Sequence, residues 1–169
     1  MRTLCVLTVV VSCAASAWAG VGETQEEAIK RCGEPSYWGK PAATNTAQAV
    51  YFKEEPHFWI TFFTNKDGRS VAGQISYQLP RELAQDKQLA EPVILKLLEA
   101  NAGGHPWTED AASERMKRLK RTYRREGATA TWFGGSLTIT IDEYLVFAEA
   151  ERKRLAAEQA ERIGESVKK

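Results

Sequence analysis

Hydrophobic positions along this chain switch between helical spacing, which predicts helices, and alternating or aromatic-rich runs, which predict strands. The first helix covers Gln25–Cys32, where apolar residues recur three to four positions apart. Thr24 and Glu27 have the Thr-x-x-Glu spacing of a capping box, which satisfies free backbone N–H groups at a helix start. Gly33 and Pro35 then end the helix, because glycine accepts a left-handed conformation and proline cannot continue the hydrogen-bond ladder.

Two further helices are predicted in the second half of the chain. One begins near Pro92, carries an apolar stripe over residues 93–98 and ends in the glycine-containing sequence at 101–104. Asp142 can cap the last helix, which runs from residue 143 to about residue 166 through a proline-free segment rich in alanine and glutamate. Apolar residues become sparse after Leu155, so we expect the distal half of this helix to project into solvent.

The strand-like runs lie between these helices. They cover residues 47–53, 57–63, 71–78, Ala128–Phe133 and 137–141. The Asn-Lys-Asp-Gly sequence at 65–68 and the Gly134–Gly135 pair are turn signals, while residues 34–46 and the polar stretch up to residue 113 are predicted loops. Residues 114–125 have apolar positions at helical spacing but can also be read as turning into a strand, and both alternatives stay open.

The order of elements is helix, three strands, helix, two or three strands, helix. Short turns between consecutive strands favour antiparallel meander sheets with helices on one face, an α+β fold. The globular domain is expected at residues 20–142, followed by a charged C-terminal helix at 143–169. The repeated rhythm is also consistent with two helix-plus-meander units, at residues 20–80 and 81–142.

Residues 1–19 are predicted to be a secretion signal. Arg2 supplies the positive start, a short apolar run follows at residues 4–11, and Ala-Trp-Ala precedes Gly20 as the small-x-small pattern of a cleavage site. Cleavage between Ala19 and Gly20 would place the mature chain outside the cytoplasm, with the periplasm as the expected compartment. The run is far shorter than the roughly 20 apolar residues that span a bilayer, so no transmembrane helix is expected in the mature chain.

Cys13 provides an alternative to cleavage after Ala19. The Val-Val-Ser-Cys sequence at residues 10–13 fits the pattern that precedes a lipidated cysteine in bacterial lipoproteins. Acylation of Cys13 would produce an outer-membrane lipoprotein in place of a freely diffusing protein.

Loss of the signal changes the composition of the chain. Removing the first 19 of 169 residues leaves 150, enough for one ordinary domain, with 22 basic and 22 acidic residues. This neutrality gives no reason to expect a nucleic acid partner. Cys32 is then the lone cysteine, which excludes an intramolecular disulfide. Because Cys32 shares an apolar helix face with Ala28 and Ile29, we expect it to be buried.

Catalytic and metal-binding patterns are weak in this sequence. His57 and His105 are its two histidines, and neither accompanies a nucleophile motif. Two distant histidines and one cysteine lack the short spacings of a zinc site. We therefore expect no catalytic residues, no metal and no cofactor, and a protein that is more readily understood as a non-enzymatic module. The alternative is a small periplasmic hydrolase or ligand-binding protein whose site the sequence does not reveal.

A basic run over residues 115–125 is one candidate for partner binding. It contains seven lysines and arginines and no acidic residue. Arg118 and Arg121, near its centre, could contact an anionic membrane surface. The alternative is a solvated face balanced by acidic residues elsewhere, which the neutral chain favours.

Aromatic residues in the strands are the second candidate. Successive side chains of a strand point to opposite faces of the sheet. If helices cover one face, every second side chain therefore points outward from the other face. Either Trp59 with Phe63, or Phe58 with Phe62, could therefore form an exposed partner-binding surface.

Residues 22–29, Gly-Glu-Thr-Gln-Glu-Glu-Ala-Ile, followed by Cys-Gly-Glu-Pro at 32–35, resemble the SmpA/OmlA family. This is the small lipoprotein of the outer-membrane β-barrel assembly machinery, and it resembles the wider β-lactamase-inhibitor-protein-like fold. In that group a similar helix ends in a Gly-x-Pro corner and leads to a meander, and the Asp67–Gly68 turn continues the likeness. The resemblance covers roughly residues 20–80 and implies contacts with envelope proteins, while residues 81–169 extend beyond the usual small unit.

Overall fold

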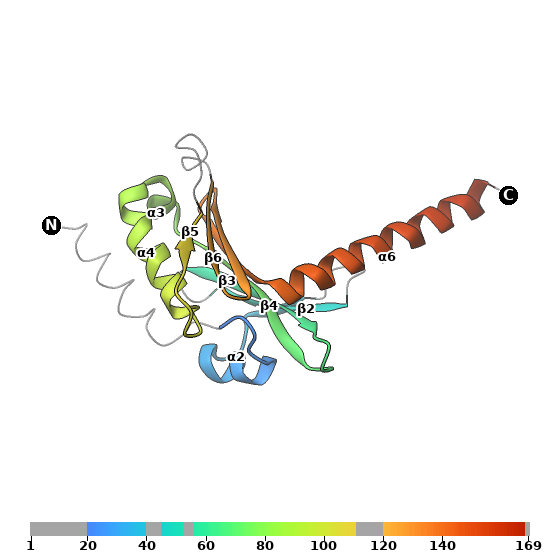
Figure 1. Cartoon of the computed structure of the whole chain (residues 1–169), viewed down its shortest axis with the longest axis horizontal. Coiled ribbons are helices and arrows are strands. Elements are labelled where there is room, and N and C mark those ends of the chain that lie inside the picture. Colours follow the sequence, from blue (N-terminus) through green and yellow to red (C-terminus); the bar gives the residue numbers. More distant parts are fainter. Residues whose placement is uncertain (1–19, 40–44, 53–55, 111–119, 168–169) are drawn as a thin grey trace.

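The structure is a computed structural model that describes residues 20–39, 45–52, 56–110 and 120–167 (Figure 1). In chain order the elements are α2 (Gln25–Cys32), β1 (Tyr37–Gly39), β2 (Thr46–Tyr51), β3 (His57–Thr64), β4 (Ser70–Gln78), α3 (Arg81–Gln85), α4 (Lys87–Ala100), β5 (Thr108–Glu109), β6 (Lys120–Arg125), β7 (Ala128–Phe133), β8 (Ser136–Ile141) and α6 (Asp142–Val167). The predicted α+β fold class is confirmed.

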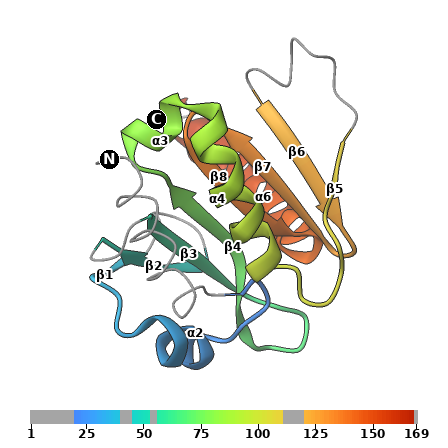
Figure 2. The ribbon, with the colours of Figure 1, turned by 90° about the vertical axis from the view of Figure 1, so that its left-hand side faces the viewer.

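The described strands form one antiparallel sheet of eight, in the order β1-β2-β3-β4-β8-β7-β6-β5. Each half of this sheet is a four-stranded meander with helices before it in the chain: α2 precedes β1 to β4, and α3 and α4 precede β5 to β8. The two meanders join where β4 pairs with β8, so the last strand of each half lies at the centre of the sheet (Figure 2). The element order therefore contains two helix-plus-meander units that share a single sheet.

The first helix forms as its capping residues predict. The Glu27 N–H donates to Thr24 Oγ1 at 3.3 Å, and the Thr24 N–H donates to Glu27 Oε2 at 2.8 Å, so both halves of the capping box are present. At the other end, Gly33 has a φ of +76° and its N–H donates to the Ile29 carbonyl at 2.7 Å. A left-handed residue at this position ends the helix and turns the chain toward β1.

The main hydrophobic core lies between one face of the sheet and the helices α2, α3 and α4. Its buried members come from alternate positions of the strands and from the inner faces of these helices: Ala28, Ala49, Tyr51, Phe58, Ile60, Phe62, Ala72, Ile75, Tyr77, Leu79, Leu83, Ala90, Val93, Ile94, Leu97, Leu98, Tyr123, Ala130, Leu137 and Ile139. Cys32 packs against this core but is only partly buried, so its expected full burial is corrected. Cys32 lies in the last turn of α2, which leaves part of its surface uncovered.

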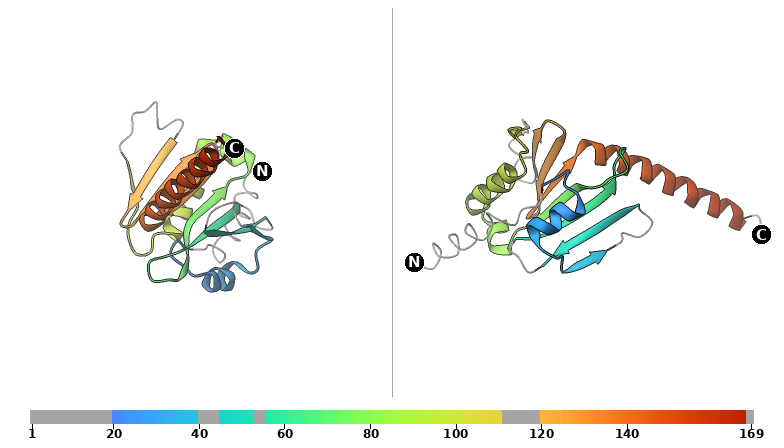
Figure 3. Two further views of the ribbon diagram at one scale, coloured as in Figure 1. Left: turned by 90° about the vertical axis from the view of Figure 1, so that its right-hand side faces the viewer. Right: turned by 90° about the horizontal axis from the view of Figure 1, so that it is seen from below.

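The base of α6 packs on the opposite face of the sheet. The ring of Phe63 on β3 lies 5.3 Å from the ring of Tyr144 and 5.2 Å from that of Phe147, measured between centroids. Figure 2 looks onto α4, and the left panel of Figure 3, from the other side, looks onto α6. Further along, α6 stays close to the start of β2 as far as Leu155, and residues 159–163 are exposed, as their sparse apolar positions predict (Figure 1).

The second helix differs from its prediction. It begins at Lys87, five residues before Pro92, and a separate short helix, α3, precedes it. Asp86 caps α4 because its Oδ1 accepts hydrogen bonds from the Gln88 N–H at 2.9 Å and the Leu89 N–H at 3.3 Å. Pro92 therefore lies inside the helix, where its exposed ring interrupts one backbone hydrogen bond without ending the helix.

The edge strands were missed by the sequence reading. Strand β1, with three residues, lies in the predicted loop at 34–46. Strand β5, with two residues, lies in the predicted polar stretch that ends at residue 113. Such short strands carry too few positions to show alternation, and they exist because β2 and β6 offer backbone groups to pair with. Residues 120–125 form a strand, so the helix alternative is wrong there, whereas 114–119 and residue 53 lie outside the described residues.

The contact between α6 and the sheet depends on a missing side chain at Gly73. A Cβ at this position would lie 2.5 Å from Tyr144 Cδ2 and 2.7 Å from Phe63 Cδ1. We predict that Gly73→Ala destabilises the protein by about 1–3 kcal/mol, the usual cost of overpacking.

The matched control is the double variant Gly73→Ala/Tyr144→Ala, followed by thermal and urea unfolding. Removing the Tyr144 ring frees part of the space that the new methyl group needs, while the contact with Phe63 remains, so the double variant should lose less stability than the two single changes combined. Strict additivity would show that the methyl group and the ring do not meet.

Candidate functional site

The sheet has one face that α2, α3 and α4 leave uncovered, and α6 contacts only one end of it. Because side chains alternate along a strand, the strand register places one line of residues across this face. That line runs Tyr37, Val50, Trp59, Ser76, Thr138, Thr131 and Thr122, from β1 to β6. It contains hydroxyl groups over the central strands and aromatic rings near the β1 edge.

Two parallel lines flank this one. On the side toward α6 lie Gly39, Gln48, Thr61, Gln74, Thr140, Thr129 and Arg124. On the other side lie His57, Gln78, Ser136, Phe133 and Lys120. Phe52 adjoins this last line, since its ring meets His57 edge-on with centroids 5.9 Å apart. We call the surface made by these three lines and Phe52 the open face. Four of its members, Val50, Thr61, Ser76 and Thr140, are buried among their neighbours, so its accessible surface comes mainly from the residues around them.

The polar side chains at the centre of the open face are paired with one another. Three hydrogen bonds cross the β4–β8 junction: Gln74 Nε2 to Thr140 Oγ1 at 3.1 Å, Ser76 Oγ with Thr138 Oγ1 at 3.1 Å, and Ser136 Oγ to Gln78 Oε1 at 2.5 Å. Paired groups need no outside partner to satisfy them, so the centre can be covered at a lower desolvation cost than an array of unpaired groups.

Exposed aromatic rings surround this polar centre. Tyr37 is 60% exposed, Phe52 58% and Phe133 61%, while Trp59 between them is partly exposed. Large apolar side chains that gather on one exposed surface are typical of binding surfaces. The open face therefore combines aromatic anchors at its margins with a hydrogen-bonded floor.

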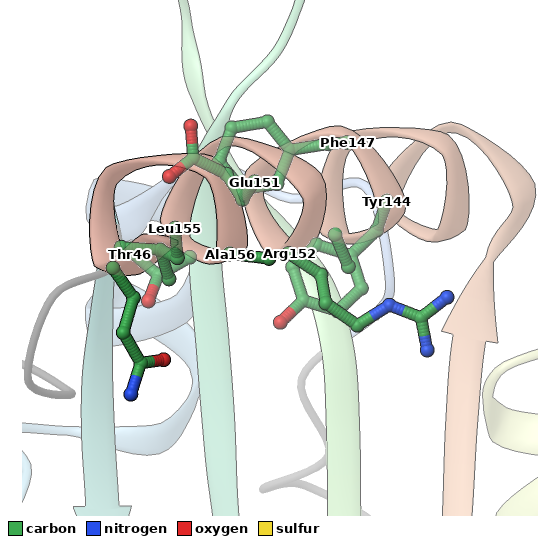
Figure 4. A pocket seen from close by; sticks show the side chains of 9 residues that line it. Thr46, Tyr144, Phe147, Glu151, Arg152, Leu155 and Ala156 are labelled. Carbon is green, nitrogen blue, oxygen red and sulfur yellow. The ribbon is translucent and has the colours of Figure 1, made fainter. Parts of the chain in front are cut away.

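Helix α6 adds a crevice at one end of the open face. The space has a volume of about 370 Å³ and lies between Thr46 at the start of β2 and the side of α6 that includes Tyr144, Phe147 and Leu155. Figure 4 shows α6 lying across the strands, with Thr46 next to Leu155. The Asn45 amide donates to Glu151 Oε1 at 3.3 Å, which joins the same helix to the chain before β2.

The structure corrects three of the aromatic candidates. Phe58 and Phe62 are 3% and 1% exposed, because they point to the face covered by α2 and α4. Phe63 is on the other side of the sheet, with Trp59, yet it is 2% exposed because Tyr144 and Phe147 of α6 cover it. Of the predicted aromatic pairs, only Trp59 keeps accessible surface, so Phe58 and Phe63 are not part of a binding surface.

Three exposed rings were not predicted as site residues. Tyr37 fell within a predicted loop, Phe52 near the end of its predicted strand, and Phe133 beside the Gly134–Gly135 turn. The one sequence signal for Phe133 was its alternation with Thr131 and Thr129, which puts all three on one face. For Tyr37 the sequence held no such signal, because β1 is too short to show alternation.

Arg121 has a structural role in the protein. Its Nη1 lies 3.0 Å from Glu91 Oε1 of α4 and its Nε lies 3.9 Å from Glu109 Oε1 of β5, with 22% of the side chain exposed. Hydrogen bonds to Tyr123 and Glu91 raise its pKa further above the usual arginine range. This pairing agrees with the alternative of a basic run balanced by acidic residues. Arg118 lies outside the described residues.

The two histidines are not brought together. His57 lies on β3 at the open face, whereas His105 lies in the loop after α4 with Nδ1 3.0 Å from Glu126 Oε2. Within the described part of the chain, no group of three His, Cys, Asp or Glu side chains could hold a metal ion. Nor does any described helix combine the length and apolar character needed to cross a membrane.

Of the residues predicted for processing, Ala19 and Cys13 lie outside the described residues, and Gly20 is the first residue described. Comparisons of the chain with protein-family models, curated proteins and solved structures found no match. The likeness to the SmpA/OmlA family stays a prediction from the residues at 22–35.

We predict that Arg121→Ala lowers the free energy of unfolding by about 1 kcal/mol. The change removes the ion pair with Glu91, which connects β6 to α4. Arg124→Ala is the matched control. Arg124 lies on the same strand and pairs with Asp110 at 2.8 Å, but its side chain is 66% exposed, so water replaces the lost contact. Urea unfolding of both variants checks this, and an equal loss in the two would contradict the structural role of Arg121.

Proposed function

We propose that this protein is an extracytoplasmic, non-enzymatic module that binds an envelope protein through the open face. The observation that supports this most is the placement of Tyr37, Phe52 and Phe133 on a face that α2, α3 and α4 leave uncovered. Large aromatic side chains that are rigid and partly exposed are the residue types that contribute most to protein interfaces.

The chemistry of the open face favours a protein over a membrane surface. Anionic lipids attract clusters of lysine and arginine, but the charged residues of the open face are Lys120 and Arg124, on β6 next to the short edge strand β5. Arg124 is already paired with Asp110. A protein surface with apolar pockets for the rings and a neutral centre matches the open face better.

The proposed location rests on the signal pattern at residues 1–19 and on the resemblance at residues 22–35. Both point to the bacterial envelope, with the periplasm as the first expectation. Acylation at Cys13 would tether the same module to the outer membrane. The tethered protein could bind its partner through the open face in the same way.

The test is a photo-crosslinking amino acid placed at Thr131, which is partly exposed in the middle line of the open face, in cells that naturally make the protein. We expect one dominant adduct with an envelope protein. The matched control carries the crosslinker at Leu95, which is 52% exposed on α4 on the other side of the sheet. Leu95 should not give that adduct.

The double variant Tyr37→Ser/Phe52→Ser should abolish the Thr131 adduct. Both side chains are more than half exposed, so the melting temperature should change little and loss of the adduct would report on binding. The same adducts from Thr131 and Leu95, or an adduct that survives the double variant, would contradict binding through the open face.

A further inference from the structure

Residues 20–23 form a turn that is hydrogen-bonded to strand β4. The Gly20 N–H donates to Glu23 Oε2 at 2.8 Å, and the Glu23 N–H donates to the Gly20 carbonyl at 3.3 Å. Two backbone hydrogen bonds of 2.7 Å join this turn to β4, one from the Gly22 N–H to the Ala72 carbonyl and one from the Ala72 N–H to the Glu23 carbonyl. The position of the Gly20 nitrogen is therefore set by the sheet.

The acceptor of the Gly20 N–H is a largely buried carboxylate. The Glu23 side chain is 15% exposed, and its second oxygen, Oε1, forms an ion pair with Arg31 of α2. A Cβ on Gly20 would lie 3.1 Å from Glu23 Oε1, so a residue without a side chain suits this close approach. The Glu23 carboxylate thus holds one cation and points its other oxygen at the Gly20 nitrogen.

Gly20 is also the residue before which the signal pattern predicts cleavage. We infer that cleavage between Ala19 and Gly20 creates an α-ammonium group that pairs with Glu23, so that removal of the signal strengthens the attachment of the N-terminal turn. Hydrolysis adds water across the peptide bond, leaving a carboxylate on Ala19 and an amino group on Gly20 that takes up a proton at neutral pH. This inference rests on the extracytoplasmic location proposed above.

The new charge strengthens a contact that the structure already contains. An ammonium donates to a carboxylate more strongly than a neutral amide N–H does, and the effect grows where solvent is excluded. Among the described residues, the ionisable groups that interact with Glu23 include Arg31 from α2 and Tyr77 from β4, and Cys32 lies close to Tyr77. Burial raises the pKa of Tyr77 well above its usual range, so Tyr77 stays neutral where the ammonium titrates.

The pH dependence of this pair has a defined sign. Pairing with a carboxylate raises the pKa of the α-amino group above its value of about 7.7–8.0 in the unfolded chain. The stabilisation is therefore complete below about pH 7.7 and is lost as the pH rises through the raised value in the folded protein.

The experiment compares the chain that starts at Gly20 with a free amine and the same chain with an acetylated amine. At pH 6.5 we expect acetylation to increase the unfolding equilibrium constant about tenfold, the equivalent of a one-unit rise in the pKa of the amine. The difference should shrink toward zero as the pH approaches 10. Equal stability of the two chains at pH 6.5 would overturn the inference.

Glu23→Gln, made in both chains, should remove the difference, because a neutral amide cannot form an ion pair. Glu26→Gln is the matched control, since Glu26 lies in the first turn of the same helix and its side chain is exposed. It should preserve the difference between free and acetylated amine. A difference that persists in Glu23→Gln would overturn the pairing.

The pKa of the Gly20 amine can also be measured directly in the unmodified sequence. The Cα of Gly20 labelled with ¹³C should report, by NMR, an amine pKa above that of the peptide Gly-Val-Gly-Glu-Thr, and an equal value would overturn the pairing. Mass spectrometry of the protein from its own cells should find Gly20 as the first residue. An acylated Cys13 would overturn the processing step while leaving the open-face function intact.

Discussion

The pairing of β4 with β8 is the contact on which the rest of the molecule depends. Within each half of the sheet, every strand pairs with its neighbour in the chain, so those contacts are local. Among the described strands, the pairing of β4 with β8 joins the two meanders, with Ile75 opposite Ile139 and Tyr77 opposite Leu137 on the side of the core. Without this junction the core would be divided, and the open face would not extend across both halves.

The same junction decides where the last helix goes. β8 lies next to β4, and α6 begins directly after β8. The first turns of α6 therefore meet β4 at Gly73 and β3 at Phe63. A glycine at this point of β4 lets the Tyr144 ring approach the backbone, beside the register shift between Thr61 and Phe62 on β3. The aromatic contact at the base of α6 is thus a consequence of the strand order.

How much of this could be predicted depends on the range of the interactions involved. The ends of α2 were predictable because Thr24, Glu27 and Gly33 act within one turn of helix. The central strands were predictable because their alternating or aromatic-rich runs extend over six to nine residues. The edge strands, and the identity of the exposed rings, depended on pairing with distant residues. Phe63 shows this best: its alternation with Trp59 places both on the open side of the sheet, and only the distant Tyr144 and Phe147 hide it.

Helix α6 contacts the rest of the protein through its first half, from Tyr144 to about Leu155. Its 26 residues correspond to a rod about 39 Å long, at 1.5 Å per residue. Ion pairs along the rod, such as Arg154 with Glu151 and Glu158, favour the helical conformation where no core supports it. A change of about 5° in the direction of the helix at Tyr144 and Phe147 would displace its far end by about 3 Å, so the packing at the sheet determines where the distal half of α6 lies.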